Sequence, residues 1–212
     1  MASTESQTYH WSEAESFLFG LQERGFSLEP GRKFFEGEGM RCTPPLVIPI
    51  GDGCRSIDDY LCGLPDKLPR HLVILMQAGA TSMAIFEDEE ALVTKSFKRY
   101  VVRGKGHSQA THLASKGKSR YGSRLRLQNA KRLIEETIEK LVEWEEEFGP
   151  AKTIYYSAPV RLWPSLFEAS ITPPFPKDGP LLKIPKDIPR PTTDVLMRTY
   201  RSLCYGRLEV AN

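Results

Sequence analysis

The chain has 212 residues and a formal net charge of +2, and 40% of its residues are hydrophobic and 26% charged. These values suit one ordinary domain, alone or with a small extension, and they exclude a disordered or collagen-like chain. The longest uncharged apolar stretches fall far short of the roughly 20 residues of a membrane span, and the N-terminus lacks the features of a secretory signal, which predicts a cytoplasmic protein.

Residues 1–70 are predicted to form an N-terminal extension or small subdomain. Apolar residues recur at helical spacing from Ser12 to Glu23, which predicts an amphipathic helix. From Gly31 to Pro69, glycines and prolines break the chain into short strands and turns, with one short helix capped by Ser56.

Residues 71–212 are predicted to form an α/β domain. Apolar runs predict a meander of three strands at 71–77, 80–86 and 91–97, followed by a short β-type run from Arg99 to Arg103. A stripe of apolar residues at 3.6-residue spacing predicts a long helix over 123–148. The remaining expected elements are a strand at 153–157, a short helix at 162–169, a strand at 181–184 and a final helix at 193–204. Strands that alternate with helices after a meander indicate a mixed β-sheet with flanking helices.

The charge is strongly polarised along the chain. Between Lys95 and Arg132 there are 12 lysines and arginines and no acidic residue, which leaves 17 basic and 27 acidic residues elsewhere. A solvated face is one interpretation of this block. Because like charges repel, however, an acid-free stretch of this length favours a polyanionic partner, and phosphate backbone in a nucleic acid or a ribosome is the obvious one.

Other chemistries find no support in the sequence. Cys42, Cys54, Cys62 and Cys204 show no CxxC pair or zinc-ligand spacing, so we expect free thiols, no metal and no cofactor. There is no Walker loop, no GxGxxG turn opening a helix, no HExxH motif and no GxSxG elbow, the signatures of nucleotide, dinucleotide, zinc-protease and α/β-hydrolase sites.

One short motif inside the basic block can carry chemistry. Gly106, His107, Ser108 and Gln109 form a GxxQ sequence between the predicted meander and the long helix. A glutamine side chain donates and accepts hydrogen bonds but does not titrate, so it can orient a water or a hydroxyl and cannot act as a general base. Taken alone, the motif is weak, and a glycine turn with a solvated polar tip is the preferred interpretation.

The surroundings of this motif add to its weight. They comprise a Lys-x-Phe-x-Arg-Tyr strand from Lys95, the GxxQ loop, a Gly-Ser-x-Leu-Arg step from Gly122 and the long helix. The final predicted helix and the residues directly before it contribute Arg190, Pro191, Thr192, Asp194, Val195 and Tyr200. On these residues the stretch from about 70 to 208 resembles the Vms-type release-factor-like family, relatives of the middle domain of the eukaryotic and archaeal class I termination factors.

The resemblance implies a release-factor middle-domain-like fold and a role in ribosome rescue. The chain would be a monomer acting on peptidyl-tRNA at the peptidyl transferase centre of a stalled ribosome or large subunit. It would free the nascent chain either by cutting the tRNA near its 3′ CCA end or by hydrolysing the ester. The rival interpretation is a non-catalytic module that binds rRNA or tRNA.

Site residues follow by position in the family pattern. Gln109 would be the central catalytic residue, Gly106 the loop glycine and Arg99 the assisting arginine that stabilises charge on a phosphate. His107 stands where termination factors have a second glycine and is a candidate general acid or base. The residues expected to bind RNA phosphates are Lys98, Arg103, Lys105, Lys116, Lys118, Arg120, Arg124 and Arg126.

Overall fold

The chain packs as two units. The structure is a computed structural model that describes residues 6–99 and 118–211, with side chains in the long helix described from Arg124 onward. Contacts between Cα atoms divide the chain into one unit formed by residues up to Leu68 together with those from Arg198, and a second unit formed by Pro69–Met197. The fold is mixed α/β, as the sequence predicts. In the part of the chain that the structure describes, no helix is both long and apolar enough to cross a bilayer.

The first unit is built on an antiparallel sheet of four strands in the order β1-β9-β3-β2. The predicted helix of this unit is confirmed as one 3-10 turn, Trp11–Glu13, followed by α1. The predicted cap is also confirmed, because the Ser56 side chain accepts a hydrogen bond of 3.0 Å from the Asp59 backbone N–H. The elements are β1 Gln7–His10, α1 Ala14–Glu23, β2 Phe35–Gly37, β3 Met40–Thr43, α2 Ile57–Cys62 and β9 Tyr205–Val210.

Strand β9 was not predicted, and it places residues 205–210 in the first unit, with the N-terminal part of the chain. It lies between β1 and β3, where Cys42 pairs with Leu208 and Tyr9 pairs with Gly206. Backbone hydrogen bonds on both of its edges therefore tie residues 205–210 to the N-terminal part of the chain, whereas the sequence analysis groups them with 71–212. A six-residue strand directly after a helix carries too little periodicity to reveal such a distant partner.

Gly206 in β9 predicts a large effect of a small substitution. A Cβ built at this position would lie 2.6 Å from Cε1 and Oη of Tyr9, whose buried ring stacks on Phe17 with centroids 4.1 Å apart. We expect Gly206→Ala to lower the free energy of unfolding by about 1–3 kcal/mol, because the Tyr9 ring must leave its packed position. Urea denaturation followed by circular dichroism measures this loss.

Gly20→Ala is the matched control for that experiment. Gly20 lies inside α1, and nothing is within 4 Å of the Cβ that alanine would add. Because alanine favours a helix interior over glycine, this variant should be as stable as the original chain or more so. Equal urea midpoints for Gly206→Ala and Gly20→Ala would contradict the prediction, because they would show that the Tyr9 ring moves aside without a loss of stability.

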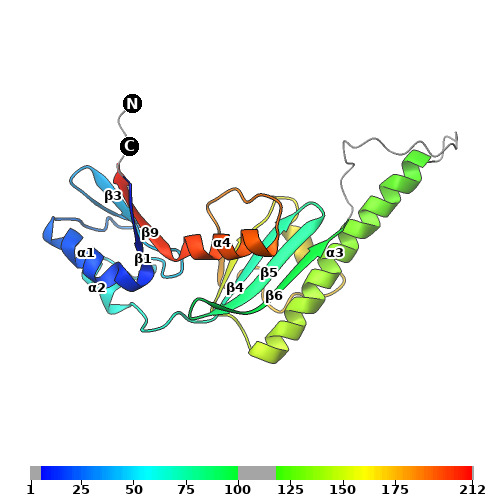
Figure 1. Cartoon of the computed structure of the whole chain (residues 1–212), viewed down its shortest axis with the longest axis horizontal. Helices are drawn as coiled ribbons and strands as arrows, with labels where there is room; N and C mark the ends of the chain where they lie inside the picture. The colour runs from blue at the N-terminus through cyan, green and yellow to red at the C-terminus, as the bar shows by residue number, and fades with distance from the viewer. Residues whose placement is uncertain (1–5, 100–117, 212) are drawn as a thin grey trace. The chain divides into compact units, whose positions relative to one another are not determined.

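The second unit holds a five-stranded sheet in the order β6-β5-β4-β7-β8. Strands β4, β5 and β6 form the predicted antiparallel meander, and β7 and β8 continue the sheet in parallel. Figure 1 shows the long helix α3 running beside β4, β5 and β6. The bounds are β4 His71–Gln77, β5 Ala80–Glu87, β6 Glu90–Lys98, α3 Lys118–Phe148, β7 Thr153–Ser157 and β8 Leu181–Lys183. The last helix, α4 Thr193–Leu203, begins in this unit and ends among the residues of the first.

Helix α3 and the sheet share one apolar core. The apolar stripe of α3 supplies Ile134, Ile138, Leu141 and Trp144, which pack with β-strand residues such as Ile74 and Met83. Ile134, Ile138 and Leu141 belong to the stripe that predicted the helix, so its core face is confirmed, and Trp144 adds to it. The core therefore holds the helix along its C-terminal half.

Two features of this unit differ from, or add to, the sequence predictions. The helix expected at 162–169 is wrong, because only the 3-10 turn Pro164–Leu166 forms there. Pro164 has no N–H and therefore fits only the first turn of a helix, and the chain from Pro173 to Pro180 forms bends and a turn. His71, fully buried beside the Tyr155 ring, has a pKa lowered to about 4 by burial and by Lys152, so it is a neutral core residue at physiological pH.

Candidate active site

The strand β6 ends at the predicted assisting arginine. β6 pairs only with β5 among the described strands, so it is the edge of the sheet. Directly after its last residue, the backbone N–H of Arg99 donates a hydrogen bond of 2.9 Å to the carbonyl oxygen of Gly79. Gly79 occupies the tight turn between β4 and β5 with φ of +81°, a conformation that glycine adopts without strain. The sheet therefore fixes the backbone at Arg99.

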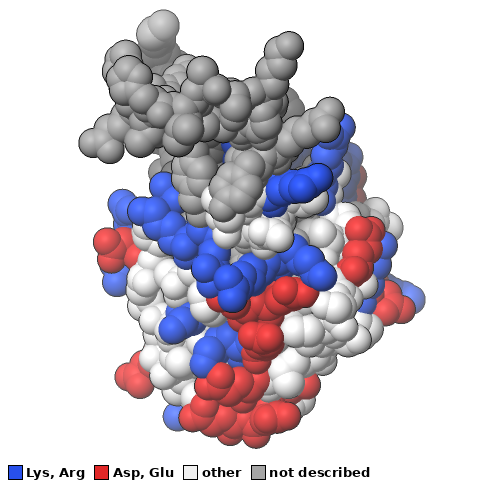
Figure 2. All heavy atoms as spheres, turned by 90° about the vertical axis from the view of Figure 1, so that its right-hand side faces the viewer, with Lys and Arg blue, Asp and Glu red and all other residues white. Residues whose placement is uncertain are grey.

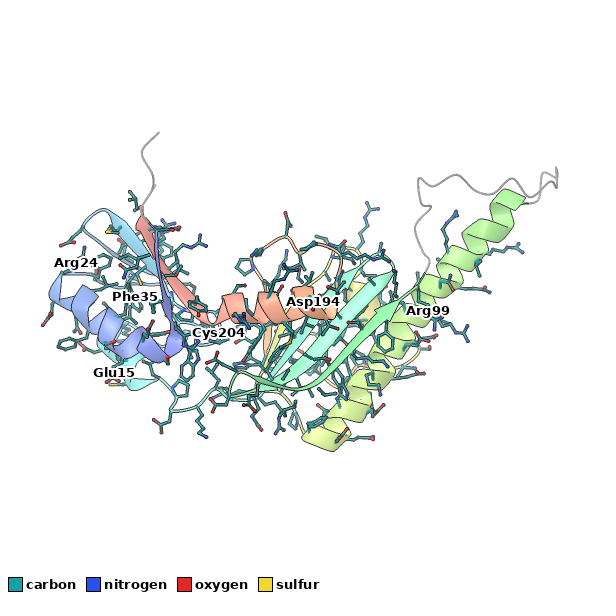
Figure 3. All side chains as sticks on the ribbon, viewed as in Figure 1. Glu15, Arg24, Phe35, Arg99, Asp194 and Cys204 are labelled. Carbon is teal, nitrogen blue, oxygen red and sulfur yellow. The ribbon has the colours of Figure 1, made fainter. Side chains whose placement is uncertain are left out.

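The side chain of Arg99 is held by α3. Its Nε donates to Oε2 of Glu136 at 3.1 Å, and its Nη2 donates to Oε1 of the same carboxylate. The two side chains are 32% and 28% exposed, so the pair lies at the surface without being fully solvated. Figure 3 shows Arg99 where β6 comes alongside α3. A bidentate arginine–carboxylate pair fixes the orientation of the guanidinium plane as well as its position.

The remaining predicted site residues divide into three groups. Lys98 and Arg124 are exposed and Arg126 is half-buried. Lys118 and Arg120 lie in the first turns of α3, and nothing is described of their side chains. Outside the described residues lie Gly106, His107, Gln109, Arg103, Lys105 and Lys116. Because a helix rises 1.5 Å per residue, Arg124 and Arg126 lie roughly 15–18 Å along α3 from Glu136, beyond contact with Arg99.

Helix α3 carries its charge in two opposite halves. Between 124 and 132 its charged side chains are all basic, and from 135 to 147 they are acidic except for Lys140. Lys131 and Glu135, whose Nζ and Oε1 atoms are 3.5 Å apart, lie at the boundary. In Figure 2 the blue lysine and arginine side chains gather in the upper part of the described surface and the red acidic ones in the lower part. This order opposes the helix dipole, so a demand other than helix stability accounts for it.

The comparison with protein families identifies the region that contains these features. Residues 71–210 match the family described as the Bacteroidetes VLRF1 release factor. The chain belongs to the Bacteroidetes VLRF1 release factor family. This membership confirms the Vms-type release-factor resemblance drawn from the motifs, and the matched region includes both Arg99 and the GxxQ sequence.

Relatives of this VLRF1 family chain include two mammalian proteins named tRNA endonuclease ANKZF1. The human protein is 35% identical over 183 residues, which are 82% of this chain and 25% of that protein. The mouse protein is 32% identical over 146 residues, which are 64% of this chain and 19% of that protein. The chain thus corresponds to a quarter or less of the length of these relatives.

A solved structure shares the fold of this VLRF1 family chain. The structure, described as the Vms1 mitochondrial localization core, superposes with a TM-score of 0.52 and covers 97% of this chain and 84% of its own. The two sequences are 14% identical in this alignment, so the likeness concerns the fold.

Sequence reasoning missed one residue of the site, Glu136. Its contact with Arg99 joins two elements that are 37 positions apart, and a single sequence contains no direct signal for such a pair. The available hint was the reversal of charge along α3, because Glu136 is among the first acidic residues after the basic block.

Proposed function

We propose that this VLRF1 family chain is a ribosome-associated enzyme that frees nascent chains from peptidyl-tRNA on stalled ribosomes or large subunits by cutting the tRNA near its 3′ CCA end. The observation that carries the proposal is the arginine held by a carboxylate at the end of β6, seven positions before the first residue of the GxxQ sequence. The naming of the ANKZF1 relatives as tRNA endonucleases favours this cut over ester hydrolysis.

The proposed reaction uses a ribose 2′-hydroxyl as the nucleophile. Its oxygen bonds to the adjacent phosphorus while the bond from phosphorus to the 5′-oxygen breaks, and the proton lost by the 2′-hydroxyl is balanced by one gained at the 5′-oxygen. Gln109 orients the hydroxyl, Arg99 stabilises the charge that develops on the phosphate, and His107 is the candidate proton carrier. Gly106 lets the backbone approach the ribose closely. The nascent chain leaves on the short 3′ fragment.

The basic residues would hold the nucleic acid in place. Lys98 and Arg124 are exposed, and the basic half of α3 offers its charge to phosphates of tRNA and rRNA. We include in this role all eight residues expected from the sequence: Lys98, Arg103, Lys105, Lys116, Lys118, Arg120, Arg124 and Arg126. The proposal has the chain act as a monomer in the cytoplasm, without a metal or cofactor.

Mapping the reaction products tests the proposal. A stalled large subunit carrying peptidyl-tRNA, labelled on both the peptide and the tRNA, is incubated with the protein and the products are resolved on a denaturing gel. We expect a tRNA shortened at its 3′ end and a peptide that still carries the missing nucleotides. Full-length tRNA with free peptide would establish ester hydrolysis instead. Cosedimentation with the subunit and neither product would establish the non-catalytic binding module.

A further inference from the structure

The guanidinium of Arg99 has two edges that can each form a pair of hydrogen bonds. Glu136 accepts from Nε and Nη2, which form one edge. Among the residues that the structure describes, nothing accepts from Nη1, so none of them occupies the edge formed by Nη1 and the second hydrogen of Nη2. A phosphate accepts from an arginine edge in the same bidentate way as a carboxylate. Arg99 can therefore bind Glu136 and a phosphate at once.

We infer that Glu136 is a positioning residue, which holds Arg99 so that its second edge meets the phosphate at the cut. The inference rests on the proposed function and extends it to a residue that does not itself touch the substrate. A free arginine side chain at the end of an edge strand would sample many rotamers, and each sampled rotamer lowers the fraction of molecules ready to react. A carboxylate on a rigid element removes this freedom before the substrate arrives.

Both ends of the pair are anchored by packing. On the helix side, the neighbours Thr137 and Ile138 are fully buried, and Thr137 Oγ1 donates to the Leu133 carbonyl at 2.7 Å. On the strand side, the hydrogen bond from the Arg99 N–H to Gly79 fixes the backbone. The pair thus joins two elements whose positions the core already sets, which is the arrangement that keeps a catalytic side chain within a fraction of an ångström.

The neighbouring carboxylates of α3 have other positions and partners. Glu135 accepts a hydrogen bond of 2.7 Å from Ser170 Oγ and pairs with Lys131. Glu139, one turn after Glu136, is exposed. Glu139 therefore offers a matched control, because replacing it removes the same charge from the same helix without touching Arg99.

Single-turnover cleavage gives the first test. Glu136→Gln keeps the shape of the side chain and loses its charge, so we expect the rate to fall roughly 10–100-fold, the usual effect of losing a partner that orients a site residue. Affinity for the stalled subunit should change less than threefold. Glu139→Gln should cleave within twofold of the original rate, and Glu136→Asp, which keeps the charge, should recover part of the loss. Equal rates for Glu136→Gln and Glu139→Gln would overturn the inference.

The dependence on Arg99 separates positioning from a general structural role. If Glu136 acts through Arg99, the Glu136→Gln change should have no further effect in a chain that already carries Arg99→Ala. If Glu136 only stabilises the fold, the double variant should lose rate by the product of the factors that the two single variants lose. Thermal unfolding of each variant shows whether any loss of rate follows from loss of structure.

A spectroscopic readout tests whether Glu136 orders Arg99 separately from whether the chain cleaves tRNA. The Nε–Hε signal of Arg99, identified by its absence in Arg99→Ala, reports the order of the guanidinium in nuclear magnetic resonance. We expect an ordered, slowly exchanging signal in the original chain and in Glu139→Gln, and a mobile one in Glu136→Gln. An unchanged signal in Glu136→Gln would overturn the inference even if the chain cleaves tRNA. Absence of any cleavage by the original chain would overturn the proposed function alone.

Discussion

Replacing Gln109 by alanine is expected to abolish release of the nascent chain while leaving affinity for the stalled ribosomal complex within a few-fold. Alanine removes both the amide donor and the carbonyl acceptor that would orient the attacking hydroxyl, and it removes no charge, so electrostatic binding is retained. Loss of one preorganised group at a reacting centre typically costs a factor of roughly 100 or more. The measurement is the single-turnover rate on peptidyl-tRNA, with cosedimentation as the binding assay.

Gln128→Ala is the control for this substitution. Gln128 is an exposed glutamine on α3, within the region that matches the VLRF1 family. Its loss should leave both the rate and the binding unchanged. If Gln109→Ala released peptide as fast as Gln128→Ala, the GxxQ segment would be an anchor rather than a catalytic element.

Replacing Arg99 by lysine is expected to slow cleavage roughly 100-fold. Lysine keeps the positive charge but lacks the planar guanidinium that can bind Glu136 and the phosphate at the same time. The ammonium of lysine cannot present one edge to Glu136 and a second, coplanar edge to a phosphate. Since the positive charge is kept, binding to the stalled subunit should stay within a few-fold. Arg99→Ala should be at least as slow as Arg99→Lys.

Arg124→Lys provides the comparison. Arg124 is an exposed residue of the basic half of α3, and its proposed contact with phosphate depends on charge more than on shape. Lysine at this position should support cleavage within about twofold. A wild-type rate for Arg99→Lys would mean that only a positive charge is required at the end of β6. The bidentate pair of Arg99 with Glu136 would then not be needed for cleavage.

Local periodicity predicted most of the second unit. The meander of β4, β5 and β6 and the strand β7 agree with the predicted ranges to within one residue. The signal is strongest in β4 and β5, because their apolar runs are buried along almost their whole length. Helix α3 begins at Lys118 rather than at 123, since its first turns are polar and carry no apolar stripe. The sequence analysis missed two short strands, β1 and β9, and the helix that it expected at 162–169 is wrong.

The candidate site was predictable only in part. Arg99 was identified from the family motif, and the structure places it at the end of the edge strand. Its partner Glu136 depends on how α3 crosses the sheet edge, which is decided by core packing and not by any local pattern. The roles of Gln109, Gly106 and His107 stay predictions from the resemblance.

The central place of β9 in its sheet imposes an order on folding. β3 meets β9 only after the chain has closed a loop of roughly 165 residues, and closing so long a flexible loop carries an entropic cost. Prior folding of Pro69–Met197 would replace much of that loop with a compact body. The second unit should therefore fold early and the first unit late. A chain halted during its own synthesis before Tyr205 would expose the edges of β1 and β3 that β9 normally covers, and such open edges favour aggregation.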